Sequence, residues 1–330
     1  MSESVAGAGE AGVAGADGVG GAAGVGPSGD PYAWLPATIV SSVARTSRAR
    51  SLILAVPGLR PARAGQHVDL RLTAEDGYTA VRSYSLSDVR ASGTSGASGA
   101  SDVDGDGADP AAGGARGGGG AGPVPQIEVT VERLDDGEVS PYLVDAAEPG
   151  DPIEVRGPIG GWFVWPPTEF DPESAVHAVL PEPEGATPPT SAPVQLVGGG
   201  SGVAPLMAMV RARGRDAPPM RLLASVRDPG SRWYVSELDE AARASSGRDA
   251  TGPLVPLVVD WVYSRTAPEG HDRRAGRLTR DELERLVLPA SEHPLVYVCG
   301  ANSFVAVVAG WLVELGHAPT RVRTERFGGV

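Results

Sequence analysis

Residues 195–205 read QLVGGGSGVAP, and this stretch decides the fold of the carboxy-terminal half of the chain. The apolar start predicts a strand, the glycines predict a tight turn, and Pro205 suits the first turn of a helix. Gly200 and Gly202 would let the backbone approach a phosphate, which the free N–H groups of a helix N-terminus attract. The spacing is G-x-G-x-x-P rather than G-x-G-x-x-G, so a glycine turn without a ligand is the alternative interpretation.

Strand and helix patterns alternate from residue 194 to the end of the chain. The runs that predict strands are VQLV (194–197), MRLLASV (220–226), LVPLVVDWVYS (254–264), LVYVC (295–299) and RVRTERF (321–327). Those that predict helices are PLMAMVRAR (205–213), SELDEAARA (236–244), TRDELERLV (279–287) and NSFVAVVAGWLVEL (302–315). We expect Ser236 to cap one helix, Thr279 and Glu282 to form a capping box, and Gly316 to end the last helix. Such alternation predicts a parallel sheet covered by helices, with ligands bound beyond the carboxyl ends of the strands.

The segment from residue 31 to 166 has short β-like patterns separated by turn residues. They are ATIVSSVAR (37–45), SLILAV (51–56), QHVDLRL (66–72), TAVRSYSLS (79–87), IEVTVERL (127–134), PIEVRG (152–157) and WFVW (162–165). One short helix interrupts them, with Ser140 as the expected N-cap and Pro141 as its first residue. The predicted fold class is an antiparallel Greek-key β-barrel followed by an α/β parallel-sheet domain.

Glycine-rich segments account for much of the content of 46 Gly and 30 Pro. Residues 1–30 and 91–123 are small and polar, and they lack the apolar residues needed to offset the entropy of ordering. We therefore predict a disordered tail and a disordered insertion in a hairpin, and a linker at 181–193. The two predicted domains span residues 31–166 and 194–330.

The composition excludes several classes of function. A net charge of −13 argues against a nucleic-acid-binding surface. Cys299 is the single cysteine, so the chain cannot hold an iron–sulfur cluster, and its five His residues show no metal-ligand spacing. No apolar run of about 18 residues predicts a membrane span, and no signal peptide is apparent. A cytoplasmic protein without a bound metal is the expectation.

Residues 81–87, VRSYSLS, place an arginine, an aromatic residue and two hydroxyls in one strand. The planar fork of Arg82 suits a phosphate. Strand alternation places Arg82 and Tyr84 on one face and Ser85 on the other. Taken alone, these letters also fit an ordinary surface strand. His67, in AGQHVDL, is expected to be a strand residue with no catalytic part.

Six short motifs occur in an order that resembles the ferredoxin–NADP(+) reductase-like flavoproteins. They are R-S-Y-S, G-E-V-S-P-Y-L, G-P-I-G-G-W-F, G-G-G-S-G-V-A-P, C-G and E-R-F. The likeness covers about residues 32–328 without the insertion, and it is greatest to the reductase components that feed electrons to oxygenases. The resemblance implies that FAD binds the barrel, with FMN as a less favoured alternative, and that NADPH or NADH binds the second domain.

The same resemblance implies roles for individual residues. Arg82 would pair with the flavin phosphate, Tyr84 would pack on the flavin, and Ser85 would lie near its N5 atom. The second flavin-binding segment would include Gly137, Val139 and Ser140. The nucleotide segment would include Gly200, Ser201, Gly202 and Pro205. Against the nicotinamide and the flavin ring would lie Cys299, Gly300, Glu325 and Phe327. The catalytic residues implied are Ser85, Cys299 and Glu325.

The identity of the nucleotide depends on the end of the second strand, ASVRDPGSRWY (224–234). Arg227 and Arg232 would meet the additional phosphate of NADPH, whereas Asp228 would accept a hydrogen bond from the ribose of NADH. Val235 stands where related proteins often carry an Arg. We predict NADPH.

The resemblance implies hydride transfer from NAD(P)H to the flavin and then electron transfer to a separate acceptor. That acceptor would be a ferredoxin, an oxygenase or a small oxidant. Two alternatives remain open at this point. One is a flavin reductase that releases reduced flavin, and the other is a non-catalytic nucleotide-binding subunit.

Overall fold

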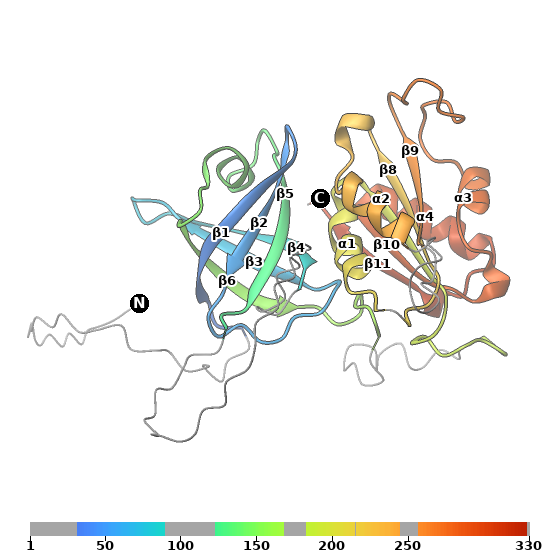
Figure 1. Cartoon of the computed structure of the whole chain (residues 1–330), viewed down its shortest axis with the longest axis horizontal. Helices are drawn as coiled ribbons and strands as arrows, with labels where there is room; N and C mark the ends of the chain where they lie inside the picture. Colours follow the sequence, from blue (N-terminus) through green and yellow to red (C-terminus); the bar gives the residue numbers. More distant parts are fainter. Residues whose placement is uncertain (1–31, 90–122, 168–182, 215, 245–256, 329–330) are drawn as a thin grey trace, which may run out of the picture.

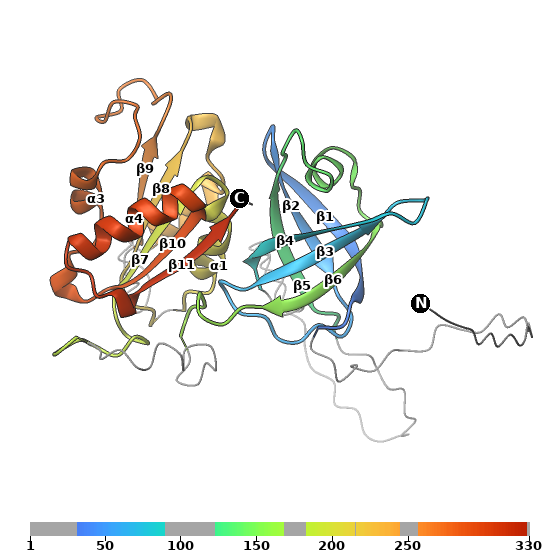
Figure 2. The same cartoon turned by 180° about the vertical axis from the view of Figure 1, so that it is seen from behind.

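The computed structural model describes residues 32–89, 123–167, 183–214, 216–244 and 257–328. The predicted disordered tail, residues 1–30, and all but the last residue of the predicted insertion, 91–123, lie outside the described residues. Two domains stand side by side (Figure 1), and the strand β11 of the second domain ends at the boundary between them (Figure 2).

The first domain is a closed antiparallel barrel with the strand order β1-β2-β5-β4-β3-β6. Its strands are β1 Leu35–Thr46, β2 Ala49–Ala55, β3 His67–Thr73, β4 Thr79–Asp88, β5 Gln126–Glu132 and β6 Pro152–Ile159. Alternating apolar side chains such as Leu52, Leu70 and Val129 fill its interior. WFVW does not form the expected strand, because this segment crosses between the domains and makes one bridge, from Trp165 to Ala64.

Strand β4 is paired unevenly on its two sides. It pairs with β3 from Thr79 to Ser85, but with β5 only through Leu86 and Asp88. The half of β4 that contains Arg82 and Tyr84 therefore presents an edge that β5 does not cover. An uncovered edge of this kind leaves backbone and side-chain groups free to contact a ligand.

The second domain is a five-stranded parallel sheet with the order β11-β10-β7-β8-β9. Its strands are β7 Val194–Gly199, β8 Met220–Val226, β9 Leu257–Tyr263, β10 Leu295–Ala301 and β11 Val322–Phe327. Its helices are α1 Val203–Arg211, α2 Val235–Ala244, α3 Arg280–Leu286 and α4 Asn302–Glu314. One apolar cluster joins α1 and α2 to one face of the sheet, and a second joins α3 and α4 to the other face (Figures 1 and 2). The predicted fold class is confirmed.

The helix ends test the local predictions. The capping box of Thr279 and Glu282 is present, and Gly316 follows α4 with a φ of +94°. The other two caps are wrong. Helix α2 begins at Val235, so Ser236 lies inside it. Ser140 accepts a hydrogen bond from the backbone N–H of Leu134 instead of capping the short helical segment Tyr142–Ala146, because its hydroxyl closes the loop before that segment.

The domains are joined by direct contacts as well as by the chain. Helix α1 packs against β4, the strand that carries the R-S-Y-S motif. The segment that crosses between the domains is also bound to the parallel sheet, because the hydroxyl of Tyr297 on β10 donates to the carbonyl of Val164 at 2.7 Å. The Arg323 guanidinium donates to the carbonyl of Trp162 at 2.9 Å. These contacts hold the flavin motif and the glycine turn in one body.

Two glycines provide a test of the packing. A Cβ atom at Gly65 (φ +95°) would lie 1.8 Å from the carbonyl oxygen of Phe163, whereas one at Gly310 in α4 would meet no atom within 4 Å. We expect Gly65→Ala to lower the free energy of unfolding by more than about 2 kcal/mol. Gly310→Ala should raise it by about 0.5–1 kcal/mol, since glycine in a helix is less favourable than alanine. Urea unfolding measures both changes, and equal effects would contradict this description.

Candidate active site

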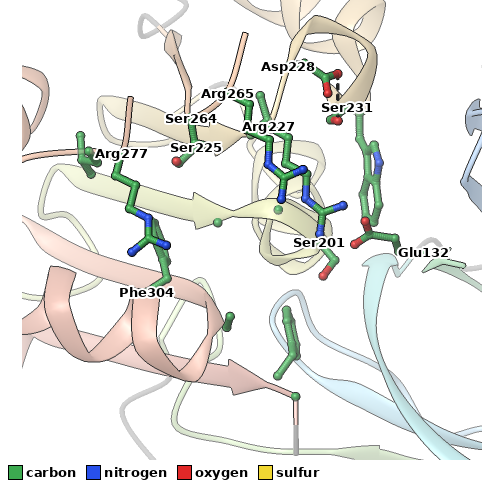
Figure 3. Close-up of a pocket in the computed structure, with 18 of the residues that line it drawn as sticks. Glu132, Ser201, Ser225, Arg227, Asp228, Ser231, Ser264, Arg265, Arg277 and Phe304 are labelled. Carbon is green, nitrogen blue, oxygen red and sulfur yellow. Dashed lines mark hydrogen bonds between the residues drawn. The ribbon is translucent and has the colours of Figure 1, made fainter. Parts of the chain in front are cut away.

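A pocket of about 1010 Å³ lies between the parallel sheet and the barrel (Figure 3). As the topology predicted, its walls come from the carboxyl ends of the parallel strands. They include Gly199, Gly200 and Ser201 at the end of β7, Ser225 to Asp228 at the end of β8, Ser264 and Arg265 after β9, Ala301 at the end of β10, and Phe327 at the end of β11. The barrel contributes Thr46, Ser47, Arg48, Glu132 and Leu134.

The glycine turn forms the floor of this pocket. Gly200 adopts a φ of +57°, and both Gly200 and Ser201 line the pocket. Gly202 is required for packing and not for lining the pocket. A Cβ atom there would lie 2.2 Å from the carbonyl oxygen of Cys299, so only glycine allows the turn to lie against β10. Pro205 is buried in the first turn of α1 and does not line the pocket.

Besides Arg48 of the barrel, which pairs with Asp135, three arginines of the parallel-sheet domain line the same pocket: Arg227, Arg265 and Arg277. Figure 3 shows their guanidinium groups directed into it. None of the three forms an ion pair with the residues that the structure describes. Three unpaired cations in one pocket of an acidic chain (net charge −13) suit a ligand with several negative charges.

Only one of these arginines was among the predicted residues. Arg227 lies where it was predicted, but Arg232 does not line the pocket. Its guanidinium donates to the carbonyl of Pro229 and lies 5.7 Å from the ring of Trp261, because the turn at residues 229–231 directs it away. The sequence analysis missed Arg265 and Arg277. For Arg265 the available signal was its position two residues after the end of β9, whereas Arg277, just before α3, had no such signal.

A second group of residues meets at the junction of the barrel and the sheet. The hydroxyl of Ser85 donates to Glu325 Oε1 in a long hydrogen bond of 3.5 Å. Glu325 pairs with Cys299 in the β10–β11 register, and His67 pairs with Ser85 in the β3–β4 register. The three residues implied to be catalytic are thus adjacent. Cys299 and Glu325 lie two residues before Ala301 and Phe327 respectively, and both of these line the pocket.

His67 belongs to the same group, although it was expected to have no catalytic part. It is a β3 residue, as predicted, but its Nδ1 lies 3.8 Å from Glu325 Oε1. The side chain of His67 is 29% exposed and that of Glu325 is 18% exposed. His67 therefore lies between the buried carboxyl and solvent.

Burial sets the protonation of this junction. It raises the pKa of Glu325 to about 7, although the hydrogen bond from Ser85 opposes the shift. Glu325 Oε2 is buried and has no hydrogen-bond partner among the described residues. Burial also raises the pKa of the Cys299 thiol well above its usual value, and the nearby Glu325 carboxylate adds to that shift. Ser85 therefore contacts a carboxyl whose pKa is near neutral, and the neighbour of that carboxyl on β10 is a neutral thiol.

The residues implied to bind flavin lie along the uncovered edge of β4. Arg82 Nη2 is 2.7 Å from Glu138 Oε2, which places it beside the loop that contains Gly137, Val139 and Ser140. Burial raises the pKa of Tyr84 to about 12. The two segments named by the resemblance, although distant in sequence, are thus in contact through Arg82 and Glu138.

Comparisons with known proteins agree with this geometry. Residues 196–310 match the family model "Oxidoreductase NAD-binding domain". The chain is 24% identical over 275 residues to a flavohemoprotein of Bacillus subtilis (strain 168), covering 81% of this chain and 51% of that one. It is 26% identical over 298 residues to the ferredoxin reductase component of the 3-ketosteroid-9-alpha-monooxygenase of Rhodococcus rhodochrous, covering 89% and 65%. It therefore spans about half the length of the flavohemoprotein.

A solved structure shares the whole architecture. The FAD/NAD-binding domain of nitric oxide dioxygenase from Vibrio cholerae O1 biovar El Tor superimposes with a TM-score of 0.60 at 19% identity, covering 89% of this chain and 99% of that one. The barrel and the parallel sheet thus form the two-domain fold of that structure. Like the order of the motifs, the comparisons show that the chain is similar to FAD/NAD(P)H oxidoreductases of the ferredoxin–NADP(+) reductase-like kind.

Two features are absent from the described residues: a membrane-spanning helix and a cluster of metal ligands. No helix there is long and apolar enough to cross a membrane. No group of three metal-ligating side chains occurs there either.

The pKa of Glu325 gives a test of the junction. Between about pH 4.5 and pH 7 the folded protein keeps a proton on Glu325 that the unfolded chain releases, so this group lowers stability as the pH rises. We expect Glu325→Gln, which cannot titrate, to gain about 1–3 kcal/mol relative to the wild type between pH 4.5 and pH 7.5.

Urea unfolding of both proteins across this range measures the difference. His67 and Cys299 face Glu325 in both proteins, so the difference between the two curves isolates the carboxyl. Parallel stability curves would contradict the raised pKa.

Proposed function

We propose that this protein is a flavoenzyme that takes hydride from NADPH onto FAD and passes the electrons to a separate acceptor. The proposal depends mainly on one observation. Ser85 of the barrel meets Glu325 of the sheet beside Cys299, at the edge of a pocket built for an anionic ligand. The likeness to a flavohemoprotein and to an oxygenase reductase component supports it.

The residues along the uncovered edge of β4 fit a flavin. The uncovered edge of β4 carries Arg82, whose fork suits a phosphate, and Tyr84, which can pack on a ring. The unpartnered Oε2 of Glu325 is a buried polar atom that a ligand would satisfy. Bound FAD would supply a ring that accepts a hydride. Ser85 and Glu325 would then hold or release a proton at its edge.

The nucleotide would lie in the pocket. The backbone N–H groups at Gly200 and Ser201 would bind its pyrophosphate at the start of α1. Arg227, Arg265 and Arg277 are three cations without ion-pair partners among the described residues, more than a pyrophosphate alone requires. This excess favours NADPH, because its 2′-phosphate adds up to two negative charges. Arg265 and Arg277, in place of Arg232, would therefore contact the 2′-phosphate of NADPH.

The acceptor is proposed from the relatives. A reductase component of a monooxygenase and a flavohemoprotein both resemble this chain over more than 80% of its length. By analogy with these relatives, a ferredoxin, an oxygenase or a small oxidant would receive the electrons.

One contact favours the second candidate, a flavin reductase that releases reduced flavin. The fork of Arg82 is already occupied by the Glu138 carboxylate at 2.7 Å, and the hydroxyl of Tyr78 also donates to Glu138. A flavin phosphate would have to displace this carboxylate and would then lie close to it. Glu138 should therefore weaken the binding of flavin.

The enzyme claim is tested by absorbance. We expect the protein purified with FAD to be yellow and to bleach within seconds when NADPH is added under argon. A protein that binds FAD but does not bleach with NADPH or NADH would contradict the proposed function and leave a nucleotide-binding subunit. A colourless protein that accelerates the reduction of added flavin would favour the flavin reductase.

The nucleotide preference is tested by removing one cation. We expect Arg277→Ala to raise the KM for NADPH about tenfold, since a charge-assisted hydrogen bond contributes about 1.5–3 kcal/mol, and to leave the KM for NADH unchanged. Arg274→Ala is the matched control, because Arg274 lies three residues away and outside the pocket. Equal increases for both nucleotides would instead assign Arg277 to a phosphate that they share.

The role of Glu138 is tested by flavin affinity. The Arg82–Glu138 pair is half exposed, with both side chains at 51%, so its removal should change affinity by a modest factor. We expect Glu138→Gln to lower the Kd for FAD about two- to fivefold, and Arg82→Ala to raise it. In the Arg82→Ala background, Glu138→Gln should have a smaller effect. Flavin fluorescence quenching measures each Kd, and weaker binding by Glu138→Gln would overturn this account.

A further inference from the structure

Four charged side chains form a closed ring across the domain boundary, called here the interdomain ring: Arg45, Glu128, Arg211 and Glu237. Arg45 and Glu128 belong to β1 and β5 of the barrel, and Arg211 and Glu237 belong to α1 and α2. Arg45 lies 3.2 Å from Glu128 and 2.7 Å from Glu237, and Arg211 lies 3.0 Å from Glu128 and 2.6 Å from Glu237. The charges alternate, so the ring is neutral.

The interdomain ring is largely closed to solvent. The side chains of Arg45, Glu128 and Arg211 are 13%, 9% and 10% exposed, and that of Glu237 is 36% exposed. The ring of Tyr234 covers both arginines, with its centroid 4.6 Å from Arg45 and 5.2 Å from Arg211. Burial alone would raise the pKa of Glu128, but Arg211 and Arg45 lower it. Each charge is therefore compensated within the interface.

Neighbouring hydroxyls complete the hydrogen bonds of this interface. Ser87 Oγ donates to Glu128 Oε1 at 2.9 Å, and the Tyr234 hydroxyl donates to Thr130 Oγ1 at 2.6 Å. The carboxylate of Asp88 lies 3.8 Å from Arg211 Nη1, outside the ring. A buried polar network with satisfied members favours one arrangement of the parts it joins.

Arg211 connects this interface to both binding segments. It ends α1, the nine-residue helix that starts at the glycine turn, so it lies about 13 Å along the helix from that turn. Its Nη1 also donates to the carbonyl of Ser87 at 3.0 Å, two residues after Ser85 on β4. One guanidinium thus links the far end of the nucleotide helix to the flavin strand.

Arg45 makes a second connection on the barrel side. It stands near the end of β1, directly before the hairpin residues Thr46, Ser47 and Arg48, which line the pocket. Its bond to Glu237 holds that hairpin against α2. The interdomain ring therefore holds two walls of the pocket, one from each domain.

We propose that Arg211 is a positioning residue for hydride transfer. Through the interdomain ring it holds α1 and the glycine turn in one register against β4, so that the nucleotide and the flavin meet in a reactive geometry. This inference rests on the proposed function. Such positioning matters because a misplacement of about 1 Å can lower a rate about a hundredfold.

The chemistry of arginine suits this task. Arg211 uses Nε and Nη2 on Glu237 and Nη1 on Glu128 and on the Ser87 carbonyl. A planar fork holds all these partners in one plane, which the single ammonium of a lysine would not. Buried ion pairs often add little net stability compared with apolar side chains, so a defined register is the main gain from this ring.

The test removes the buried charges in a neutral pair. In Arg211→Met/Glu128→Gln, Arg45 and Glu237 are kept, so the interdomain ring stays neutral, although Asp88 loses Arg211 as a neighbour at 3.8 Å. At saturating NADPH we expect the rate constant for flavin bleaching to fall tenfold or more, while the Kd values for FAD and NADPH stay within about twofold. The control is Arg221→Met/Asp260→Asn, which removes a 2.9 Å pair between β8 and β9, away from the barrel. It should bleach at the wild-type rate.

A second measurement needs no cofactor. In the flavin-free double variant we expect faster hydrogen exchange at the amides of residues 84–88 and 203–211 than in the wild type, with no change in the control. Arg211→Lys should give intermediate rates of bleaching and of exchange. If the double variant does not fold, Glu237→Gln, at the most exposed position of the ring, replaces it with an expected loss of about threefold in bleaching rate.

The outcomes separate the two claims. Wild-type bleaching and exchange in the double variant would overturn the inference, and so would a lower melting temperature with an unchanged bleaching rate. A wild-type protein that binds flavin but does not bleach would overturn the proposed function. Hydrogen exchange would still decide whether the interdomain ring couples α1 to β4.

Discussion

The packing of α1 against β4 is the contact on which the rest of the structure depends. Helix α1 starts at the glycine turn, and β4 carries Tyr84 and Ser85, so this contact decides where the two binding segments meet. At one end Gly202 allows the turn to lie against the carbonyl of Cys299. At the other end Arg211 bonds to the carbonyl of Ser87. A shift of either element would separate the groups that hydride transfer must bring together.

Charged side chains are arranged differently in the pocket and at the domain boundary. The whole chain is acidic, yet the pocket collects Arg227, Arg265 and Arg277 without carboxylate partners among the described residues. At the domain boundary, by contrast, the cations are matched with carboxylates in a closed ring. Between these two regions Glu325 is buried beside Ser85, and burial raises its pKa to about 7. The three pocket arginines are therefore available for a ligand, and the interdomain ring joins the two domains. Glu325 has a pKa near neutral pH.

The sequence predicted the fold class and most elements, and its failures have physical causes. The capping box of Thr279 and Glu282 was predictable because its bonds join residues three apart. Serine is a common N-cap residue, but the hydroxyl of Ser140 instead accepts a hydrogen bond from the backbone N–H of Leu134, six residues earlier. The sequence analysis predicted that Arg232 contacts the nucleotide because Arg232 follows the second strand of the domain. In the structure a turn directs its guanidinium toward Trp261, and no local sequence pattern indicates that direction.

Periodicity, glycine spacing and motif order by themselves determined a barrel, a parallel sheet, the resemblance to two-domain flavoproteins, and Arg82, Tyr84 and Ser85 as candidate residues. These features depend on backbone preferences and on neighbours a few positions apart. Only the tertiary structure decided that Ser85 bonds to Glu325, that His67 faces the same carboxyl, and that four charges close a ring between the domains. Such contacts join residues far apart in the sequence, as Ser85 and Glu325 are at a separation of 240 positions. Their geometry depends on how two packed bodies meet, which is a property of the fold and not of any segment.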